Sequence, residues 1–246
     1  MTESRVKTKF ISFKDLIVYE DDDILLVNKP ENVSSLDDKS KRNINHLAKV
    51  YNPELQLCHR LDKMTSGILL LAKGSENYRE IALQFQHRKV HKTYMALVRG
   101  VHHHEETEVD LPLLVTTNKR VIAHKNDGKK AITMVSTEKT FRNYTLLRCQ
   151  PITGRMHQIR VHLLSLGSPI VGDDLYKGED LMLSSIKRKY KLSGRKMEER
   201  PLNHGYMLHA QQIQFTHPKT GEEMTFDAPY PKNFSVVLKM LDKYDS

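Results

Sequence analysis

Tryptophan is absent from this sequence of 246 residues, and cysteine occurs only twice, as Cys58 and Cys149. Neither cysteine belongs to a CxxC pair or lies at a zinc-ligand spacing from histidine, so a structural zinc site is excluded and a reducing compartment is favoured. Cys58 precedes His59, but adjacent side chains of an extended segment point to opposite sides. We therefore predict a buried thiol at Cys58 and no Cys/His nucleophile.

Long apolar runs are also missing. No stretch of the sequence approaches the roughly 18 apolar residues that cross a bilayer. Residues 1–10, MTESRVKTKF, lack the apolar core of a secretion signal. We expect a cytoplasmic protein that makes no contact with a membrane.

Basic residues are in excess, with 39 Lys and Arg against 30 Asp and Glu and a formal net charge of +9. A positive field of this kind attracts polyanions, so nucleic acid is the first partner to test. Hydrophobic residues make up 39% of the chain, which suffices for one large domain or two coupled lobes. Charge alone leaves open a solvated basic surface that has no specific partner.

Apolar periodicity predicts strands mixed with a few helices. Residues 92–100 are apolar on both alternating faces, as in a central strand, and an amphipathic pattern predicts a helix that starts with Ser75 as its N-cap. The other expected elements are a hairpin over 16–28, strands at 68–72 and 145–149, a helix at 155–166 closed by Gly167, and a hairpin around 218–221. We expect a single α+β domain over 1–246 with a largely antiparallel sheet.

Two polar clusters need separate explanations. Three consecutive histidines, His102–His104, cannot converge on one ion from a regular strand, so we predict an exposed loop and no metal. The segment 177–201 carries seven Lys or Arg between Lys187 and Arg200 and few large apolar residues. We interpret it as a basic insertion, either a loop or a mobile helix, in which Lys187, Arg188 and Lys189 are candidate contacts to RNA.

An arginine lies within the apolar stripe of the helix expected after Gly154. The stripe contains Met156, Ile159, Leu163 and Leu166, with Arg160 among them. A guanidinium cannot lose its charge, so a buried Arg160 needs an anionic partner, and Asp62 in "HRLDKMTSG" is a candidate. The residues alone leave open the alternative that Arg160 extends to solvent while Asp62 caps a turn.

Four ordered segments resemble the motifs of RluA-type pseudouridine synthases. They are HRLDKMTSG followed by LLLAK, then KTYMALVRG, PITGRMHQIRVHLLSLGSPIVGDDLY and LHAQQIQFTHPKTGE, and the resemblance runs from about Lys14 to Phe234. It implies an α+β catalytic fold with a long bent, mainly antiparallel sheet, flanking helices and a central cleft. It also implies isomerisation of specific uridines, first in large-subunit ribosomal RNA, with transfer RNA as the alternative target.

The same resemblance implies the roles of four residues. Asp62 would be the catalytic aspartate, Tyr94 the active-site tyrosine, and Arg160 the partner of Asp62. Arg60 would enter the RNA stack as the target base leaves it. The plainer alternatives are that Tyr94 is a tyrosine of the strand core and that Arg60 is a surface residue touching phosphate.

Three departures from the family pattern bear on these expectations. Met156 replaces the usual Thr or Ser after Gly-Arg, which we expect to alter packing near Arg160. Asn32 replaces the usual glycine after "NKP", and Asn tolerates positive φ, so the turn should survive. Too few residues precede the first motif for a small N-terminal RNA-binding domain, so RNA affinity is expected from the catalytic domain, which we expect to be a monomer.

Uridine isomerisation involves neither redox change nor hydrolysis, so we expect no cofactor and no metal. One nucleophilic carboxylate suffices, whether it adds to C6 of uracil or assists loss of the base at C1′, and a nearby guanidinium favours its charged form. An aspartate-dependent phosphotransferase is a rival, although Asp62 precedes its strand and lacks the DxD arrangement that would hold magnesium beside it. A non-catalytic RNA-binding or ribosome-assembly factor is the second rival.

Overall fold

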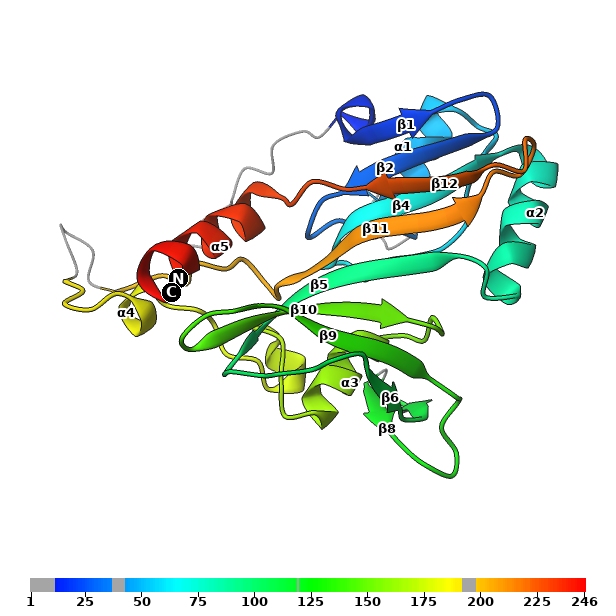
Figure 1. The fold of residues 1–246 in the computed structure, drawn as a ribbon. Coiled ribbons are helices and arrows are strands. Elements are labelled where there is room, and N and C mark those ends of the chain that lie inside the picture. The colour runs from blue at the N-terminus through cyan, green and yellow to red at the C-terminus, as the bar shows by residue number, and fades with distance from the viewer. Residues whose placement is uncertain (1–11, 37–42, 119, 192–197) are drawn as a thin grey trace.

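The computed structural model describes residues 12–36, 43–118, 120–191 and 198–246. Ten strands form one bent sheet in the spatial order β1-β2-β4-β11-β5-β10-β9-β6, with β12 beside β11 and β3 beside β4 (Figure 1). A two-stranded sheet, β7 and β8, lies apart from it. The strands are β1 (Ile17–Glu20), β2 (Ile24–Lys29), β3 (Leu55–Leu57), β4 (Ser66–Lys73), β5 (His91–Arg99), β6 (Thr107–Asp110), β7 (Leu113–Val115), β8 (Val121–Ala123), β9 (Ile132–Thr140), β10 (Tyr144–Pro151), β11 (Leu208–Thr216) and β12 (Glu223–Asp227).

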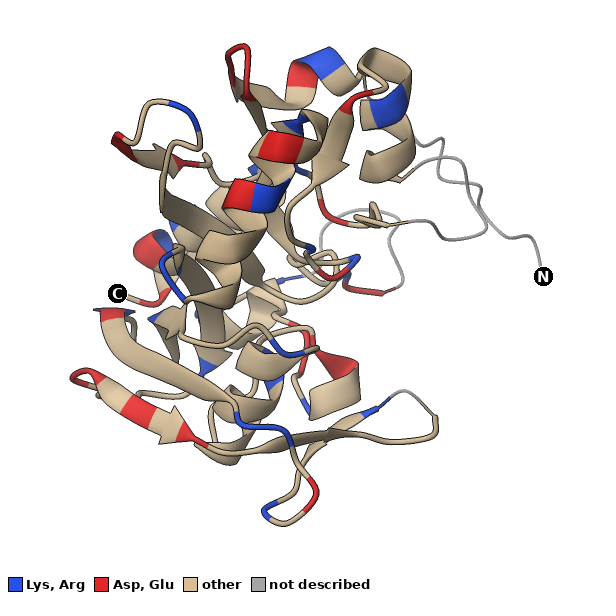
Figure 2. Ribbon diagram, turned by 90° about the vertical axis from the view of Figure 1, so that its right-hand side faces the viewer, with Lys and Arg blue, Asp and Glu red and all other residues tan. Residues whose placement is uncertain are grey.

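Few helices accompany this sheet, so the expected α+β class with a mainly antiparallel sheet is confirmed. The helical elements are η1 (Phe13–Leu16), α1 (Ile44–Tyr51), α2 (Gly74–Gln86), α3 (Gln158–Ser165), η2 (Asp174–Tyr176), α4 (Leu183–Ile186) and α5 (Lys232–Tyr244). None of the helices in the described ranges is long and apolar enough to span a membrane. In Figure 2, Lys and Arg are scattered among Asp and Glu over the ribbon and do not gather into one stripe.

The expected strands and hairpins are present. The hairpin of β1 and β2, the central position of β5 between β11 and β10, and the hairpin of β11 and β12 all match the sequence prediction. Residues 66–72 of β4 are buried, as expected for a strand covered on both faces. Asn32 has φ 61°, so the turn after β2 survives without glycine.

One junction in the sheet, which we call the seam, lies between β4 and β11. These strands are parallel and pair at only two positions, Ser66 with His209 and Gly67 with Ala210. Gly67 has φ 115°, and a Cβ there would lie 2.2 Å from the carbonyl oxygen of Ala210, so no other residue fits. The Oγ of Ser66 is 2.9 Å from Nδ1 of His209 and adds a buried hydrogen bond across the seam.

Two helix boundaries differ from the prediction. Helix α2 starts at Gly74, after Lys73, and Ser75 lies in its first turn without acting as a cap. Helix α3 starts at Gln158 and not at Arg155, because His157 has a left-handed φ of 53° and the preceding residues form a turn. Moreover, α3 has no amphipathic stripe, since every residue from Gln158 to Leu163 is buried.

The three histidines lie in a loop, as predicted, but the loop is not free. His102 accepts or donates at both ring nitrogens, with Nδ1 3.0 Å from the Ser168 hydroxyl and Nε2 2.8 Å from the Arg99 carbonyl. Its ring stacks on His104 with centroids 6.2 Å apart, whereas His103 is exposed. The loop is therefore anchored to β5 and to the segment after α3.

Candidate active site

A hollow of about 440 Å³ opens at the middle of the sheet, a size typical of small-molecule sites. Its walls come from the loop before β4, from β5, and from the turn that leads into α3. Asp62 is the only acidic residue among the described residues that line it. They are His59, Arg60, Leu61, Asp62, Thr65, Phe85, Lys92, Tyr94, Pro151, Thr153, Gly154, Arg155, Met156, His157, Gln158, Ile159, Arg160 and Leu208.

The backbone around Asp62 is fixed by buried hydrogen bonds. Leu61 donates its N–H to the hydroxyl of Ser35 at 3.0 Å, and that hydroxyl donates back to the Leu61 carbonyl at 2.8 Å. Thr65 donates its N–H to the Asp62 carbonyl at 3.1 Å, which closes a turn just before β4. The side chain of Asp62 is 22% exposed, so it is held firmly yet stays open to the hollow.

Lys29 stabilises the backbone of this loop through hydrogen bonds, a role that the sequence analysis did not assign to it. It is fully buried, and its ammonium donates to the carbonyls of Pro30, Val33 and Lys63 at 2.9, 2.8 and 3.1 Å. Burial lowers the pKa of Lys29 to about 7, although the charge of Asp62 acts in the opposite direction. Lys29 therefore ties the turn after β2 to the Asp62 loop, and the "NKP" motif was its only signal in the sequence.

Arg160 binds a different carboxylate more closely than the expected one. Its Nε and Nη2 donate to the two oxygens of Asp173, each at 2.7 Å, and Asp173 is only 1% exposed. The distance from Arg160 Nη1 to Asp62 Oδ2 is 3.6 Å, an ion pair without a hydrogen bond. The predicted pairing with Asp62 therefore needs correction. Asp173 is the primary partner of Arg160, and Asp62 faces only the remaining nitrogen, Nη1, of the guanidinium.

Two tyrosine rings hold that guanidinium in place. The Cζ of Arg160 lies 4.3 Å from the ring centroid of Tyr206 and 4.8 Å from that of Tyr176, within the range of cation–π contacts. The hydroxyl of Tyr206 is 3.1 Å from the hydroxyl of Thr65. Arg160 is buried, paired and held between rings, so the alternative in which it extends to solvent is wrong.

His157 is a further site residue that sequence reasoning missed. Val121 donates its N–H to the Tyr176 hydroxyl at 3.2 Å, and that hydroxyl lies 2.8 Å from Nδ1 of His157. The hydroxyl can donate its own proton to Nδ1, an arrangement in which the imidazole proton lies on Nε2. Nε2 faces Asp62 Oδ2 at 3.9 Å. Burial lowers the pKa of His157, which favours this neutral form.

Tyr94 and Arg60 both line the hollow. Tyr94 lies on β5 and is 8% exposed, and burial followed by the charge of Asp62 raises its pKa, so its hydroxyl remains protonated. Arg60 is exposed at the rim, next to the buried Leu61. Met156, the departure from the family pattern, is half-buried there and packs against a small cluster that includes Tyr176.

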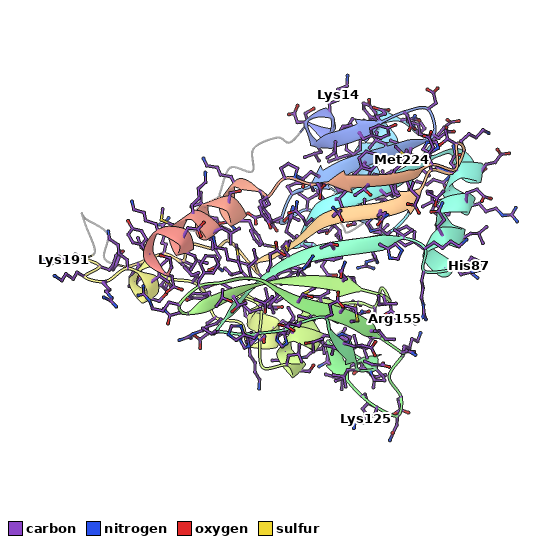
Figure 3. All side chains as sticks on the ribbon, in the orientation of Figure 1. Lys14, His87, Lys125, Arg155, Lys191 and Met224 are labelled. Carbon is purple, nitrogen blue, oxygen red and sulfur yellow. The ribbon has the colours of Figure 1, made fainter. Side chains whose placement is uncertain are left out.

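The basic segment lies elsewhere. Lys187 follows α4, and its ammonium lies 5.5 Å from the ring centroid of Tyr244 at the end of α5. Neither Lys187 nor Arg188 nor Lys189 lines the hollow. Figure 3 shows Lys191 at the opposite end of the molecule from Arg155. Part of the predicted insertion, 192–197, lies outside the described residues.

A possible metal-ligand cluster occurs at Asp21, Asp23 and His217, far from Asp62 in the fold. Nδ1 of His217 accepts N–H bonds from Lys219 and Thr220 at 3.2 and 3.1 Å. Its proton must then lie on Nε2, which is 3.2 Å from Asp21 Oδ2. Both ring nitrogens are in use, so these residues form a hydrogen-bonded clamp that does not fit a metal ion.

Comparison with known proteins agrees with this geometry. The family model for RNA pseudouridylate synthases matches residues 23–165. The ribosomal large subunit pseudouridine synthase C of Buchnera aphidicola is 37% identical over an alignment of 241 residues that covers 94% of this chain and 72% of that protein. The protein of the same description from Escherichia coli K12 is 34% identical over 240 residues, covering 95% of this chain and 72% of the relative.

Solved structures give the same result. Human RNA pseudouridylate synthase domain containing 4 superposes with a TM-score of 0.68 at 25% identity, over 94% of this chain and 95% of that one. Human RNA pseudouridylate synthase domain containing 1 gives 0.65 at 25% identity, over 94% and 96%. The chain therefore belongs to the RNA pseudouridylate synthase family and is an isomerase of that class.

Proposed function

We propose that this enzyme converts specific uridines of large-subunit ribosomal RNA to pseudouridine, with Asp62 as the nucleophile. The observation that carries the role of Asp62 is its place as the one acid among the described residues of the hollow, within 3.6 Å of a fixed guanidinium. The target is supported by relatives described as ribosomal large subunit synthases. Transfer RNA is the alternative target.

The chemistry needs one carboxylate. The bond between N1 and C1′ breaks, the uracil turns, and C5 bonds to C1′; the proton of C5 is released, N1 ends protonated, and no water is consumed. Two routes are open to a carboxylate here. Asp62 either adds to C6 of uracil, or it assists departure of the base at C1′ through a glycal with a proton removed at C2′.

The neighbouring groups suit a nucleophilic carboxylate at Asp62. Arg160 offers positive charge, and because Asp173 and two tyrosine rings fix it, little reorganisation is needed during the reaction. The Nε2–H of His157 provides a second donor that faces the same carboxylate oxygen. The protonated hydroxyl of Tyr94 is available to the sugar while its ring faces the base.

RNA contacts outside the hollow complete the proposal. A target inside folded RNA must leave its stack before Asp62 can reach it, which costs a few kcal/mol. Arg60 is exposed at the rim, two residues from Asp62, and we propose that it fills the space left by the base. We propose that Lys187, Arg188 and Lys189 contact RNA phosphates far from the target uridine. We also propose that the enzyme is a cytoplasmic monomer.

The decisive variant is Asp62→Asn, which keeps the side-chain volume and removes the charge. It should fold, bind RNA within a few fold of wild type, and yield no pseudouridine in single-turnover assays with enzyme in excess, since binding and bond rearrangement rest on different groups. Conversion comparable to wild type would refute the nucleophile and revive the non-catalytic rival. Pseudouridine mapping in total RNA from cells with and without the gene would separate ribosomal from transfer RNA.

A further inference from the structure

A second hollow of about 380 Å³, which we call the side groove, adjoins the active-site hollow. The two share Phe85, Lys92, Thr153, Gly154 and Arg155, so they are continuous. One wall of the side groove is the segment 85–90, from the end of α2 to the start of β5, and the other is the segment 152–155 between β10 and α3. In Figure 3, His87 and Arg155 mark these two walls at the same end of the molecule.

The charge of the side groove has one sign. Its nine lining residues include the three cations Arg88, Lys92 and Arg155, and none of the nine is acidic. In Figure 2, positive and negative residues are scattered over the rest of the ribbon. A concave surface with one sign of charge concentrates counter-ions, and a polyanionic strand that leaves the active-site hollow would meet cations on both walls.

Lys92 lies where the two hollows meet. Its ammonium lies 5.7 Å from the ring centroid of Phe85 and close to the backbone at Gly154, where an added Cβ would be 3.7 Å from Nζ. Within the described ranges it makes no ion pair and no hydrogen bond. Burial lowers its pKa to about 8. The nearby His59 does not accept a hydrogen bond from Lys92 through Nε2, because that nitrogen already accepts the N–H of Leu70.

Lys29 shows what a structural buried lysine looks like in this fold. Its three ammonium protons are all donated to backbone carbonyls, at 2.8 to 3.1 Å. Lys92 is only partly buried, and its ammonium lines both hollows without a protein acceptor within the described ranges. The contrast shows that, unlike Lys29, Lys92 keeps its donors available to a ligand in the groove.

We propose that the side groove carries the RNA strand next to the target uridine and that Lys92 Nζ binds a phosphodiester of that strand. Phosphate oxygens supply the missing acceptors, and Arg88 and Arg155 flank the same path from the two walls. The inference rests on the proposed function, because the strand is followed outward from a uridine at Asp62.

The test compares two single-charge variants in an Asp62→Asn parent, so that turnover plays no part. Lys92→Met removes the ammonium from the groove, and Lys14→Met removes an exposed one at the top of Figure 3, away from the groove. With a short single-stranded oligouridylate as the probe, Lys92→Met should weaken binding about tenfold. It should also make the slope of log K against log salt less steep by about 0.7, while Lys14→Met leaves the slope unchanged.

Two further measurements separate binding from folding. Lys92→Arg keeps a cation and should retain the salt slope. Lys92→Met should unfold at a temperature close to that of the parent, because within the described ranges the ammonium makes no hydrogen bond or ion pair that the change would break. The inference would be overturned by an unchanged salt slope in Lys92→Met or by an equal change of the slope in Lys14→Met. It would also be overturned if Lys92→Met lost affinity and melted at a lower temperature while Lys92→Arg did not restore the affinity. None of these outcomes depends on pseudouridine formation, so failure here is distinct from failure of Asp62 as nucleophile.

Discussion

Replacement of Arg160 by Met should destabilise the fold and abolish activity, and for separate reasons. Asp173 is 1% exposed and accepts two charge-assisted hydrogen bonds of 2.7 Å from Arg160. Bonds of this kind contribute about 1.5 to 3 kcal/mol each, and removal of one partner of a buried pair costs about 3 to 5 kcal/mol in total. Against a typical total stability of about 5 to 15 kcal/mol, that loss is severe.

A double variant separates the two effects. In Arg160→Met with Asp173→Leu, the stranded carboxylate is gone and two apolar side chains of similar size replace the pair, so much of the lost stability should return. Activity should not return, because Asp62 still lacks the guanidinium at 3.6 Å. Urea unfolding gives the free energy of unfolding for each variant, and single-turnover conversion with excess enzyme gives the chemistry.

Two results would refute this reasoning. A loss below about 1 kcal/mol in Arg160→Met would show that Asp173 does not depend on its partner, since a surface ion pair has that magnitude. Near wild-type conversion in either variant would show that Asp62 needs no guanidinium.

Three other perturbations have defined outcomes. Tyr176→Phe removes the hydroxyl that holds His157, so single-turnover conversion should fall roughly tenfold while RNA affinity stays unchanged. The ¹⁵N spectra of the imidazole should no longer show the Nε2–H form alone. An unchanged tautomer and an unchanged rate would contradict the hydrogen-bond chain. Burial lowers the pKa of His209 to about 4, below its value near 6.5 in the unfolded chain. The unfolded chain therefore takes up the proton first, and stability is lost as pH falls through this window, by roughly 3 kcal/mol at pH 4. Urea unfolding of His209→Gln should show a flatter pH dependence of stability there, and an equally steep dependence would exclude His209 as the cause. Changing Lys187, Arg188 and Lys189 together to Gln should weaken RNA binding and reduce its salt slope by about 0.7 to 0.9 per lost phosphate contact, whereas an identical salt series would mark the segment as a solvated surface.

The strands and hairpins could be predicted because their signals are local. β1 with β2, and β11 with β12, are pairs of β-rich runs joined by short polar turns, and β5 is apolar on both faces. Helix α3 was harder, because a helix buried on all sides has no apolar stripe to fix its limits. Its start was misplaced by the left-handed residue His157, whose conformation depends on tertiary contacts.

The site was predicted in part. Motif resemblance pointed to Asp62, Tyr94 and Arg160, and the chemistry of a buried guanidinium required an anion. Spacing could not reveal that Asp173 is the nearer carboxylate, because the two acids lie on segments that meet only in the folded chain. Tyr176 escaped notice for the same reason, since its hydroxyl acts through His157 and is not among the described residues that line the active-site hollow.

The seam also divides the reactive groups into two sets. Asp62 is tied through Lys29 and Ser35 to the β2 and β4 side, while Arg160 is tied through Asp173 and the tyrosines to the side of β11 and β5. The backbone joins these sides at only two residue pairs. Side-chain hydrogen bonds from Ser66 to His209 and between the hydroxyls of Thr65 and Tyr206 add to this short pairing. The distance between Asp62 and Arg160 is therefore a distance across the seam, and it depends on contacts that an RNA bound to both sides of the sheet would share.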